Sequence, residues 1–294
     1  MRLLCRLAAL IAIITAGAFA QPVIYGSAYL GPNSPASFYQ INPNNGSATL
    51  IGSIGFKRVG SMDFSPAGTL YAAGQDGSGP NLLTINIATG VGTKIANISG
   101  TGGDVFQDIA FRPSDGVLFG YAEGDIYRIN LTTGAATLVG GPGGFPDGNG
   151  LAFSSANVLY LSNNSGGTVG NLYSINQTNA AETVAAPLSY SGFPATDFIR
   201  TSGIKFDASG TIWAAVVNGS GDNEGTAPTW SLGRMNVATG NVTRVGATVS
   251  GLDAIAVRTG GGTSVPALTF PAALILCALL GAFALFTLRR PALS

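Results

Sequence analysis

Short apolar segments recur along the chain in a fixed order, separated by Gly, Pro, Asn and Asp. Two steps mark each recurrence: an apolar residue followed by an aromatic one, and Ile or Met followed by Asn. The first step occurs at Ile24-Tyr25, Leu70-Tyr71, Leu118-Phe119, Leu159-Tyr160 and Ile212-Trp213. The second occurs at Ile41-Asn42, Ile85-Asn86, Ile129-Asn130, Ile175-Asn176 and Met235-Asn236. The asparagines of the second step are 44, 44, 46 and 60 residues apart.

A period of this size, with several short strands in each repeat, is typical of a β-propeller. Each full unit contains four apolar runs bounded by turn residues, as in 60–64, 69–73, 82–86 and 91–95. The sequence therefore predicts an all-β fold with five blades. A sixth blade is the alternative if the longer stretch after Asn176 contains a degenerate unit.

The turns between the third and fourth strands share a pattern. Thr-Gly or Asn-Gly supplies the residue with positive φ that a tight hairpin needs, and Asn179 is expected to take this conformation where Asn179-Ala180 replaces the pair. The Asn of each Ile-Asn step is predicted to cap the same turn with its side chain.

The ends of the repeat region complement each other. Residues 24–54 provide three strands of a blade and lack the first, and residues 252–257 match that missing strand. The two pieces are predicted to complete one blade, which removes exposed sheet edges. The propeller is therefore expected to span residues 21–258. Its repeats resemble the YVTN/NHL class of bacterial propellers, in which the strand pair around "A-F-x-P-x-G-x-L-Y" lines a central channel.

The first 20 residues read as a secretory signal peptide. Arg2 and Arg6 precede an apolar stretch, and Ala18-Phe19-Ala20 forms an A-x-A cleavage motif before Gln21. An N-terminal membrane anchor is the alternative, although the apolar run is short for a span.

A second apolar segment follows the repeats. Residues 269–288 carry no charge and are long enough to cross a bilayer as a helix, and the basic residues of the tail 289–294 are expected to stay in the cytoplasm. A linker with a Pro motif, 259–268, precedes this helix. The arrangement predicts a single-pass protein with its body outside the membrane and a short basic tail inside.

This ending resembles the PEP-CTERM and IPTL-CTERM sorting signals, which combine a Pro motif, an apolar helix and a terminal Arg cluster. The matching residues are Val265, Pro266, Leu268, Arg289 and Arg290. The polar stretch usual after the Pro motif is absent, since Thr269-Phe270-Pro271 stands there. The resemblance implies recognition by a sortase-like membrane protease and export to the surface of a Gram-negative bacterial cell, where the protein is either anchored or released. A plain tail anchor is the alternative.

The amino-acid composition limits which partners, catalytic groups and metal sites the protein can have. The exported body has ten Lys and Arg against fourteen Asp and Glu, a net charge of −4, which argues against a nucleic-acid partner. The chain has no His, and its two cysteines, Cys5 and Cys277, lie in the targeting segments. Catalytic triads that need His or Cys and His-ligated zinc are therefore excluded. We expect no cofactor and no metal. The loops at 221–224 and 76–78 could hold Ca²⁺, but neither fits the twelve-residue spacing of an EF-hand loop, so solvated loops are the preferred interpretation.

The connections between strands predict which face binds a ligand. The first-to-second and third-to-fourth turns are short and lie on one face, whereas the long connections lie on the other. The long-loop face gathers aromatic and polar side chains suited to a glycan or a protein partner. The candidate ligand-binding residues are Gln107, Asp108, Asn149, Phe193, Phe198, Ser202, Trp230 and Asp253. The alternative is that the aromatics, together with Phe56, Phe106, Phe145 and Tyr190, fold over the blade tops as hydrophobic clusters.

Three functions fit this sequence. The first is a non-enzymatic, exported module that binds a glycan or an envelope or matrix protein. The second is a glycan hydrolase or lyase that uses channel carboxylates such as Asp108 and Asp253. The third is a structural component of the surface or matrix, suggested by the low charge and high Gly content.

Overall fold

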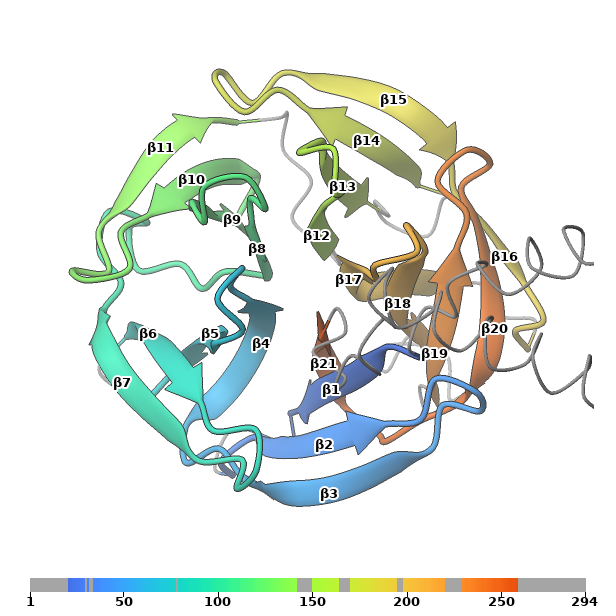
Figure 1. The fold of residues 1–294 in the computed structure, drawn as a ribbon, viewed down its shortest axis with the longest axis horizontal. Coiled ribbons are helices and arrows are strands. Elements are labelled where there is room, and N and C mark those ends of the chain that lie inside the picture. Colours follow the sequence, from blue (N-terminus) through green and yellow to red (C-terminus); the bar gives the residue numbers. More distant parts are fainter. Residues whose placement is uncertain are drawn as a thin grey trace, which may run out of the picture. The chain divides into compact units, whose positions relative to one another are not determined.

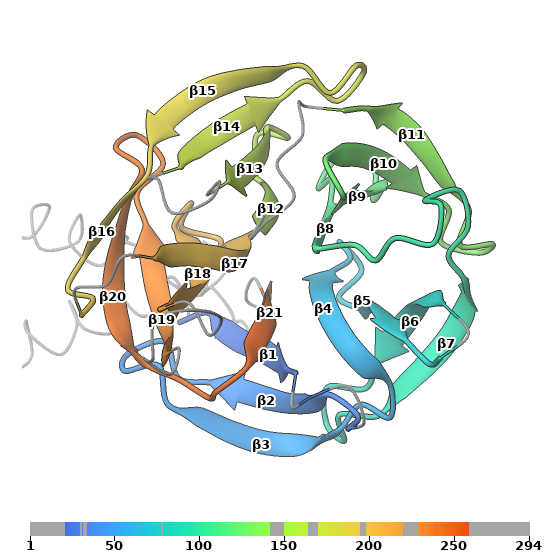
Figure 2. The same cartoon turned by 180° about the vertical axis from the view of Figure 1, so that it is seen from behind.

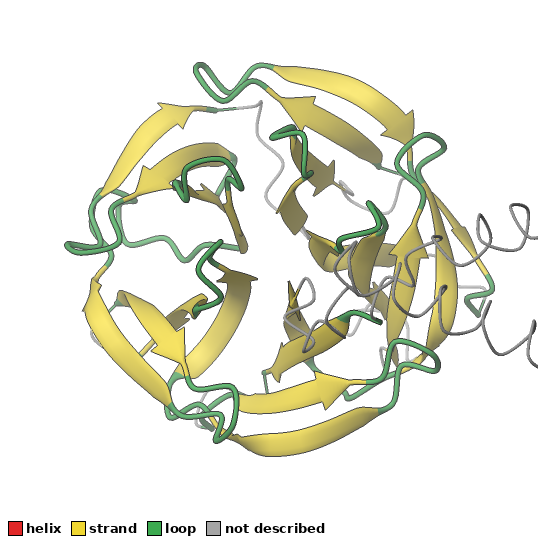
Figure 3. Ribbon diagram, in the orientation of Figure 1, coloured by secondary structure: helices red, strands yellow, loops and turns green. Residues whose placement is uncertain are grey.

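The structure, a computed structural model, describes residues 21–29, 31, 34–77, 79–141, 150–163, 170–194, 198–219 and 229–258. The chain divides into two units, Met1–Gly260 and Gly261–Ser294, and every described residue lies in the first. All regular structure among the described residues is β-strand (Figure 3). The predicted signal peptide, sorting motif and membrane helix fall outside the described residues.

The described strands form five sheets arranged as blades around a common axis, each built on four antiparallel strands (Figure 1). From the axis outward, the first blade contains β21 (Leu252–Arg258), β1 (Val23–Ala28), β2 (Ser37–Ile41) and β3 (Ala48–Ser53). The second contains β4 (Lys57–Phe64), β5 (Leu70–Gln75), β6 (Pro80–Ile85) and β7 (Gly92–Asn97). The third contains β8 (Asp108–Phe111), β9 (Leu118–Ala122), β10 (Asp125–Ile129) and β11 (Ala136–Gly140). The fourth contains β12 (Gly150–Phe153), β13 (Leu159–Asn163), β14 (Asn171–Ile175) and β15 (Glu182–Pro187). The fifth contains β17 (Ile199–Phe206), β18 (Ile212–Asn218), β19 (Thr229–Met235) and β20 (Asn241–Ala247).

The prediction of five blades is confirmed, and the six-bladed alternative is wrong. The described residues of the longer stretch after Asn176 add no sheet. Its extra residues form β16 (Ser189–Ser191), which pairs in parallel with β20 as a fifth, outermost strand of the fifth blade. The chain thus leaves the fourth blade along the outer edge of the next one, where β16 covers backbone groups that would otherwise be unpaired.

Ring closure also follows the prediction. The C-terminal strand β21 pairs antiparallel with β1, with Ile24 opposite Val257 and Tyr25 opposite Ala256. The two ends of the repeat region therefore supply one blade together. Seen from either side, β21 lies beside β1 and β4 near the centre (Figure 2).

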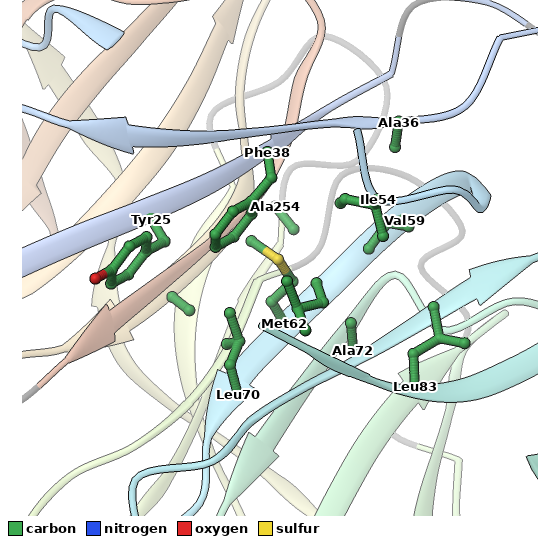
Figure 4. Packing of buried hydrophobic residues seen from close by; sticks show 12 residues of the cluster. Tyr25, Ala36, Phe38, Ile54, Val59, Met62, Leu70, Ala72, Leu83 and Ala254 are labelled. Carbon is green, nitrogen blue, oxygen red and sulfur yellow. The ribbon is translucent and has the colours of Figure 1, made fainter. Parts of the chain in front are cut away.

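The hydrophobic core consists of five clusters, one at each boundary between neighbouring blades. At the boundary of the first and second blades, Tyr25 and Phe38 face Met62 and Leu70 (Figure 4). This arrangement explains the alternation in the sequence, because the side chains of a strand point alternately toward the blade before and the blade after. Each blade therefore depends on both neighbours for burial.

The repeated aromatic residue of each second strand has a defined partner. Tyr25 packs on Phe64, Tyr71 on Phe111, Phe119 on Phe153 and Tyr160 on Phe206, with ring centroids 5.2–5.8 Å apart. Each pair joins one blade to the inner strand of the next, and such pairs contribute roughly 0.5–1.5 kcal/mol beyond their buried area. At the closing boundary Val257 replaces the phenylalanine, and Arg234 lies over Trp213 at 4.6 Å from the ring centroid instead.

The side chains of the repeated asparagines cap the third-to-fourth turns, as predicted. In all five blades the Asn side-chain oxygen accepts a hydrogen bond of 2.9 Å from the backbone amide two residues later. The prediction for the fourth blade was wrong in one respect: Ala180, and not Asn179, takes the positive φ, at 58°. Its Cβ is accommodated because it faces Gly140 of the third blade, which has no side chain.

Strand direction separates the two ends of the propeller. Each inner strand of the second to fifth blades begins at the end that carries the second-to-third and fourth-to-first connections, here called the loop face. It finishes at the end that carries the short turns, here called the turn face.

Candidate functional site at the propeller axis

Carboxylates on two inner strands bond to the backbone of the strands beside them. Asp63 on β4 accepts a hydrogen bond of 2.7 Å from the amide of Phe111 on β8. Asp108 on β8 accepts bonds from the amides of Leu151 on β12, at 2.8 Å, and Ile204 on β17, at 3.3 Å. An inner strand has a buried edge without a sheet partner, so its amides need such acceptors. These two acids therefore fasten neighbouring blades together at the axis.

A buried lysine completes this network. The Lys205 ammonium lies 2.7 Å from both carboxylate oxygens of Asp108 and donates to the carbonyls of Leu151, at 2.9 Å, and Ile204, at 2.8 Å. The side chains of Lys205 and Asp108 are 3% and 1% exposed. The ion pair and its backbone partners join the third, fourth and fifth blades.

Burial dominates the acid–base properties of these groups. It raises the pKa of Asp63 to about 6, against the attraction of Lys205 and bonds from the amides of Phe111 and Phe64. It raises the pKa of Asp108 to about 7, and the Lys205 ammonium and the amides of Leu151 and Ile109 oppose the rise. Desolvation penalises the charged carboxylate, whereas a cation and amide donors favour it.

A different group of charged residues lies where three consecutive inner strands begin, at the loop face. Asp253 on β21 stands between Arg58 on β4 and Arg200 on β17. We call these three residues the axial site. Burial raises the pKa of Asp253, and the two arginines counteract the rise. Asp253 makes neither a hydrogen bond nor an ion pair with any described residue.

Backbone irregularities occur at Asp253, Arg58 and the neighbouring Ser202, whereas Arg200 pairs regularly with Val217. Asp253 and Ser202 each lack a pairing partner on the neighbouring strand of the sheet, because the register shifts by one residue at each position. On β4, residues 58–60 oppose only Gly74, and Arg58 has a φ of +39°. Such β-bulges redirect side chains and are common beside functional sites.

The surroundings of the axial site leave hydrogen-bonding capacity unused. Arg200 lies over the ring of Phe198, at 5.4 Å from its centroid, and its buried Nε has no hydrogen-bond partner among the described residues. Gly60 leaves room for the acid, since a Cβ there would lie 3.2 Å from Oδ2 of Asp253. Ser202 donates to the carbonyl of Leu252 at 3.3 Å, which ties β17 to β21.

The predicted site residues separate into distinct groups. Asp253 and Ser202 lie together at the axial site, whereas the Asp108 side chain is buried in the ion pair with Lys205. Gln107 exchanges two hydrogen bonds with Glu123, at 3.0 and 3.1 Å, on the third blade. Asn149 lies outside the described residues.

The predicted aromatic residues are mostly engaged in packing. Phe193 meets Tyr190 edge-on at 5.9 Å and packs against the cluster between the fourth and fifth blades. Trp230 packs against the cluster that includes Trp213, and Phe106 is 1% exposed. These positions match the interpretation that loop-face aromatics cover the blade tops.

The predicted site consisted of acidic, amide, hydroxyl and aromatic side chains and included no basic residue. It therefore lacked Arg58, Arg200 and Lys205, the three basic residues at the axis. A signal was present for Lys205, because a lysine between Ile204 and Phe206 in a predicted inner strand must be buried and needs a partner. The arginines gave no comparable signal, since each is the second residue of its inner strand, next to a connection, where a basic residue is expected to be solvated.

The described residues contain no group of three or more His, Cys, Asp or Glu that could hold a metal ion. Nor does this part of the chain include a helix with the length and apolarity to cross a membrane. Residues 221–224, 78 and 269–288 lie outside it.

Comparison with solved structures finds distant similarity to propeller proteins. TolB from Acinetobacter baumannii aligns with a TM-score of 0.48 and 16% identity, over 83% of this chain and 57% of TolB. Hydrazine synthase from Kuenenia stuttgartiensis aligns with a TM-score of 0.41 and 14% identity, over 63% and 47% of the two chains. PQQ-bound aldose sugar dehydrogenase from Streptomyces coelicolor aligns with a TM-score of 0.41 and 17% identity, over 72% and 82%. No ligand or activity follows from similarity at this level.

Sequence comparison is more specific. No curated protein matches the chain. One family profile matches residues 19–197, which includes most of the first blade and all strands of the second, third and fourth. The chain belongs to the family described as a repeat of unknown function, DUF6923.

Proposed function

We propose that this propeller is a non-enzymatic binding protein, exported to the bacterial cell envelope, that holds a glycan at its loop face. The axial site carries the proposal. It places two guanidinium groups and one carboxylate at the start of neighbouring inner strands, and Arg200 has a buried donor without a partner among the described residues. A polar ligand would satisfy these groups.

The remaining axial acids favour binding over hydrolysis. A glycosidase needs two carboxyl groups free to exchange protons or attack the sugar. Asp108 instead holds Lys205 with both oxygens and accepts three backbone amides. Asp63 likewise accepts the amides of Phe64 and Phe111. The hydrogen bonds of Asp63 and Asp108 connect neighbouring blades. Asp108 is therefore not free to act as the second catalytic carboxyl group, which the hydrolase hypothesis paired with Asp253.

Export and surface delivery complete the proposal. The signal-like residues 1–20, the Pro motif at Val265-Pro266 and the apolar segment 269–288 with Arg289-Arg290 support it. The resemblance to PEP-CTERM and IPTL-CTERM signals would make a sortase-like membrane protease a processing partner. The resemblance to YVTN/NHL repeats is compatible with the same surface role.

A glycan array combined with product analysis tests the proposal. The full-length chain is incubated with surface and matrix polysaccharides, and both retention and shortened products are measured. Retention of a glycan without shortened products is the expected result. Release of shortened products would replace the proposal with the hydrolase hypothesis. Failure to retain any glycan, combined with capture of an envelope protein, would shift the ligand class to protein.

A structural role is a second candidate, favoured by the outer strands. Leu50, Leu138 and Val184 are 59%, 57% and 56% exposed and occupy the same register, opposite a tyrosine of the neighbouring strand. In the second and fifth blades this register position holds Lys94 and Arg244. Exposed aliphatic residues on an outer strand favour association between sheets.

Sedimentation of the full-length chain tests the structural role. Assembly that increases with concentration and is abolished by Leu50→Lys with Leu138→Lys is the result expected of a surface-layer component. A monomer at all concentrations would contradict it.

A further inference from the structure

The axial site has a charge arrangement that the fold itself does not need. Arg58 and Arg200 lie on β4 and β17, the inner strands that pack on either side of β21 and Asp253, yet no ion pair joins them to Asp253 among the described residues. By contrast, the Lys205–Asp108 pair closer to the turn face is closed at 2.7 Å and bonded on all sides. The same axis thus contains one satisfied charge network and one open network.

The two arginines are held in different ways. One face of the Arg200 guanidinium lies over Phe198, which fixes the plane of the group, and its Nε is buried. Arg58 is exposed and stands on a bulge with a positive φ, a conformation that non-glycine residues rarely take. Strain of this kind persists where the surrounding structure fixes the conformation, and it is concentrated at functional sites.

The chemistry of the groups defines the ligand. A guanidinium presents several donors in a planar fork that matches a carboxylate, which it often binds through two parallel hydrogen bonds. A carboxylate such as Asp253 accepts hydrogen bonds from hydroxyl groups but repels an anion. A ligand that satisfies the three groups together must carry an acidic group for the arginines and neighbouring hydroxyls for the aspartate.

We infer that Arg58 and Arg200 bind the carboxylate of a uronic acid residue in an acidic polysaccharide, and that Asp253 accepts hydrogen bonds from its hydroxyl groups. This inference rests on the proposed function and specifies its ligand. The ring of Phe198 beside Arg200 adds an apolar surface of the kind that sugar rings contact. A neutral glycan would leave the guanidinium donors without an anionic acceptor.

A pair of ligands that differ only in charge provides the sharpest test. Binding of the full-length chain to oligogalacturonate is compared, by calorimetry, with binding to the fully methyl-esterified oligomer. We expect binding of the acid form and a loss of at least about tenfold in affinity for the ester, the range for a hydrogen bond to a charged group. Equal affinity for both forms would overturn the inference.

Variants assign the binding to the axial site. Arg58→Gln, at an exposed position, and Arg200→Gln are each expected to weaken oligogalacturonate binding at least about tenfold. Arg200→Lys keeps the charge but lacks the planar fork, so it should recover only part of the affinity. Lys94→Gln removes the same charge from an outer strand, where Lys94 pairs with Asp76, and should leave binding unchanged. A loss of equal size in Lys94→Gln would show a general charge effect and contradict the assignment.

Two outcomes separate this inference from the proposed function. Retention of neutral glycans that is unaffected by Arg58→Gln and Arg200→Gln would leave the binding role intact and overturn the uronate assignment. Competition by dextran sulfate as strong as that by oligogalacturonate would show a site that detects charge alone, and would also overturn it. Melting temperatures of the variants, measured in parallel, identify any loss of binding caused by unfolding.

Discussion

Replacing Lys205 by Met tests whether the axial ion pair holds the blades together. Met has a similar length and is apolar, so the change removes the charge while largely filling the space. Asp108 would remain at the axis with its amide donors, and the carbonyls of Leu151 and Ile204 would lose their donor. The perturbation thus isolates the contribution of one ammonium group.

The burial of the pair sets the magnitude. Removing one partner from a buried ion pair leaves an uncompensated charge and costs about 3–5 kcal/mol of unfolding free energy. Asp108 can limit this cost by binding a proton, since burial already raises its pKa to about 7 with Lys205 present. The destabilisation should therefore be smaller at pH 5 than at pH 8, where protonating the acid is more costly.

Urea unfolding followed by tryptophan fluorescence measures the effect. Trp213 and Trp230 are the two tryptophans of the chain, and Trp213 is 2% exposed in the same blade as Lys205. A cycle with Lys205→Met, Asp108→Asn and the double variant gives the coupling energy directly. Lys94→Met, in a pair whose side chains are 34% and 28% exposed, is the control and should cost no more than about 1 kcal/mol.

A loss of unfolding free energy in Lys205→Met as small as that of the control would contradict a stabilising role for the axial ion pair. A loss in the double variant equal to the sum of the single variants would also contradict it, because the two groups would then not act as a pair. A coupling of at least about 2 kcal/mol is expected from contacting buried charges.

Two further predictions concern the acids and the turns. The folded state raises the pKa of Asp63 to about 6 and of Asp108 to about 7, so it binds more protons than the unfolded chain between pH 4 and 7, and the unfolding free energy should fall as pH rises through that range. Asp63→Asn should reduce this fall by up to about 3 kcal/mol, at roughly 1.4 kcal/mol per pKa unit; urea titrations at pH 4.5, 5.5 and 7 measure it, and an unchanged slope would contradict the burial argument. Gly134→Ala should destabilise by more than about 2 kcal/mol, because φ is +71° and a Cβ would overlap the Asn97 carbonyl of the preceding blade. Gly68→Ala has φ +85° but open space and should cost only about 1 kcal/mol, so equal melting temperatures for the two variants would show that the close approach is unimportant.

The fold could be predicted from local signals because each blade repeats them. Asn86 and its equivalents predicted both the turns and their caps, and the match of residues 252–257 to a missing strand predicted ring closure. Ala180 could not be placed correctly, since its positive φ depends on Gly140, a glycine from the preceding blade that the local sequence does not reveal.

The site was less predictable than the fold. Asp253 and Ser202 were placed near the axis because they begin inner strands, but their orientation comes from bulges that insert one residue without a sequence signal. Asp108 was taken for a ligand-binding acid because Lys205, its partner, lies 97 positions away in the sequence. Long-range pairs of this kind follow from which blades meet at the axis and not from local pattern.

The pairing of β1 with β21 has a consequence for how the protein forms. Synthesis proceeds from the N-terminus, and domains begin to fold as the chain emerges. The first blade holds three of its strands from residue 53 onward but receives its innermost strand only when residues 252–258 arrive. Until then the edge of β1 stays open to incorrect pairing. The last strand thus completes the first blade and closes the ring. A chain interrupted before residue 252 would be an open ring with an unpaired β1 edge, and not a slightly shorter propeller.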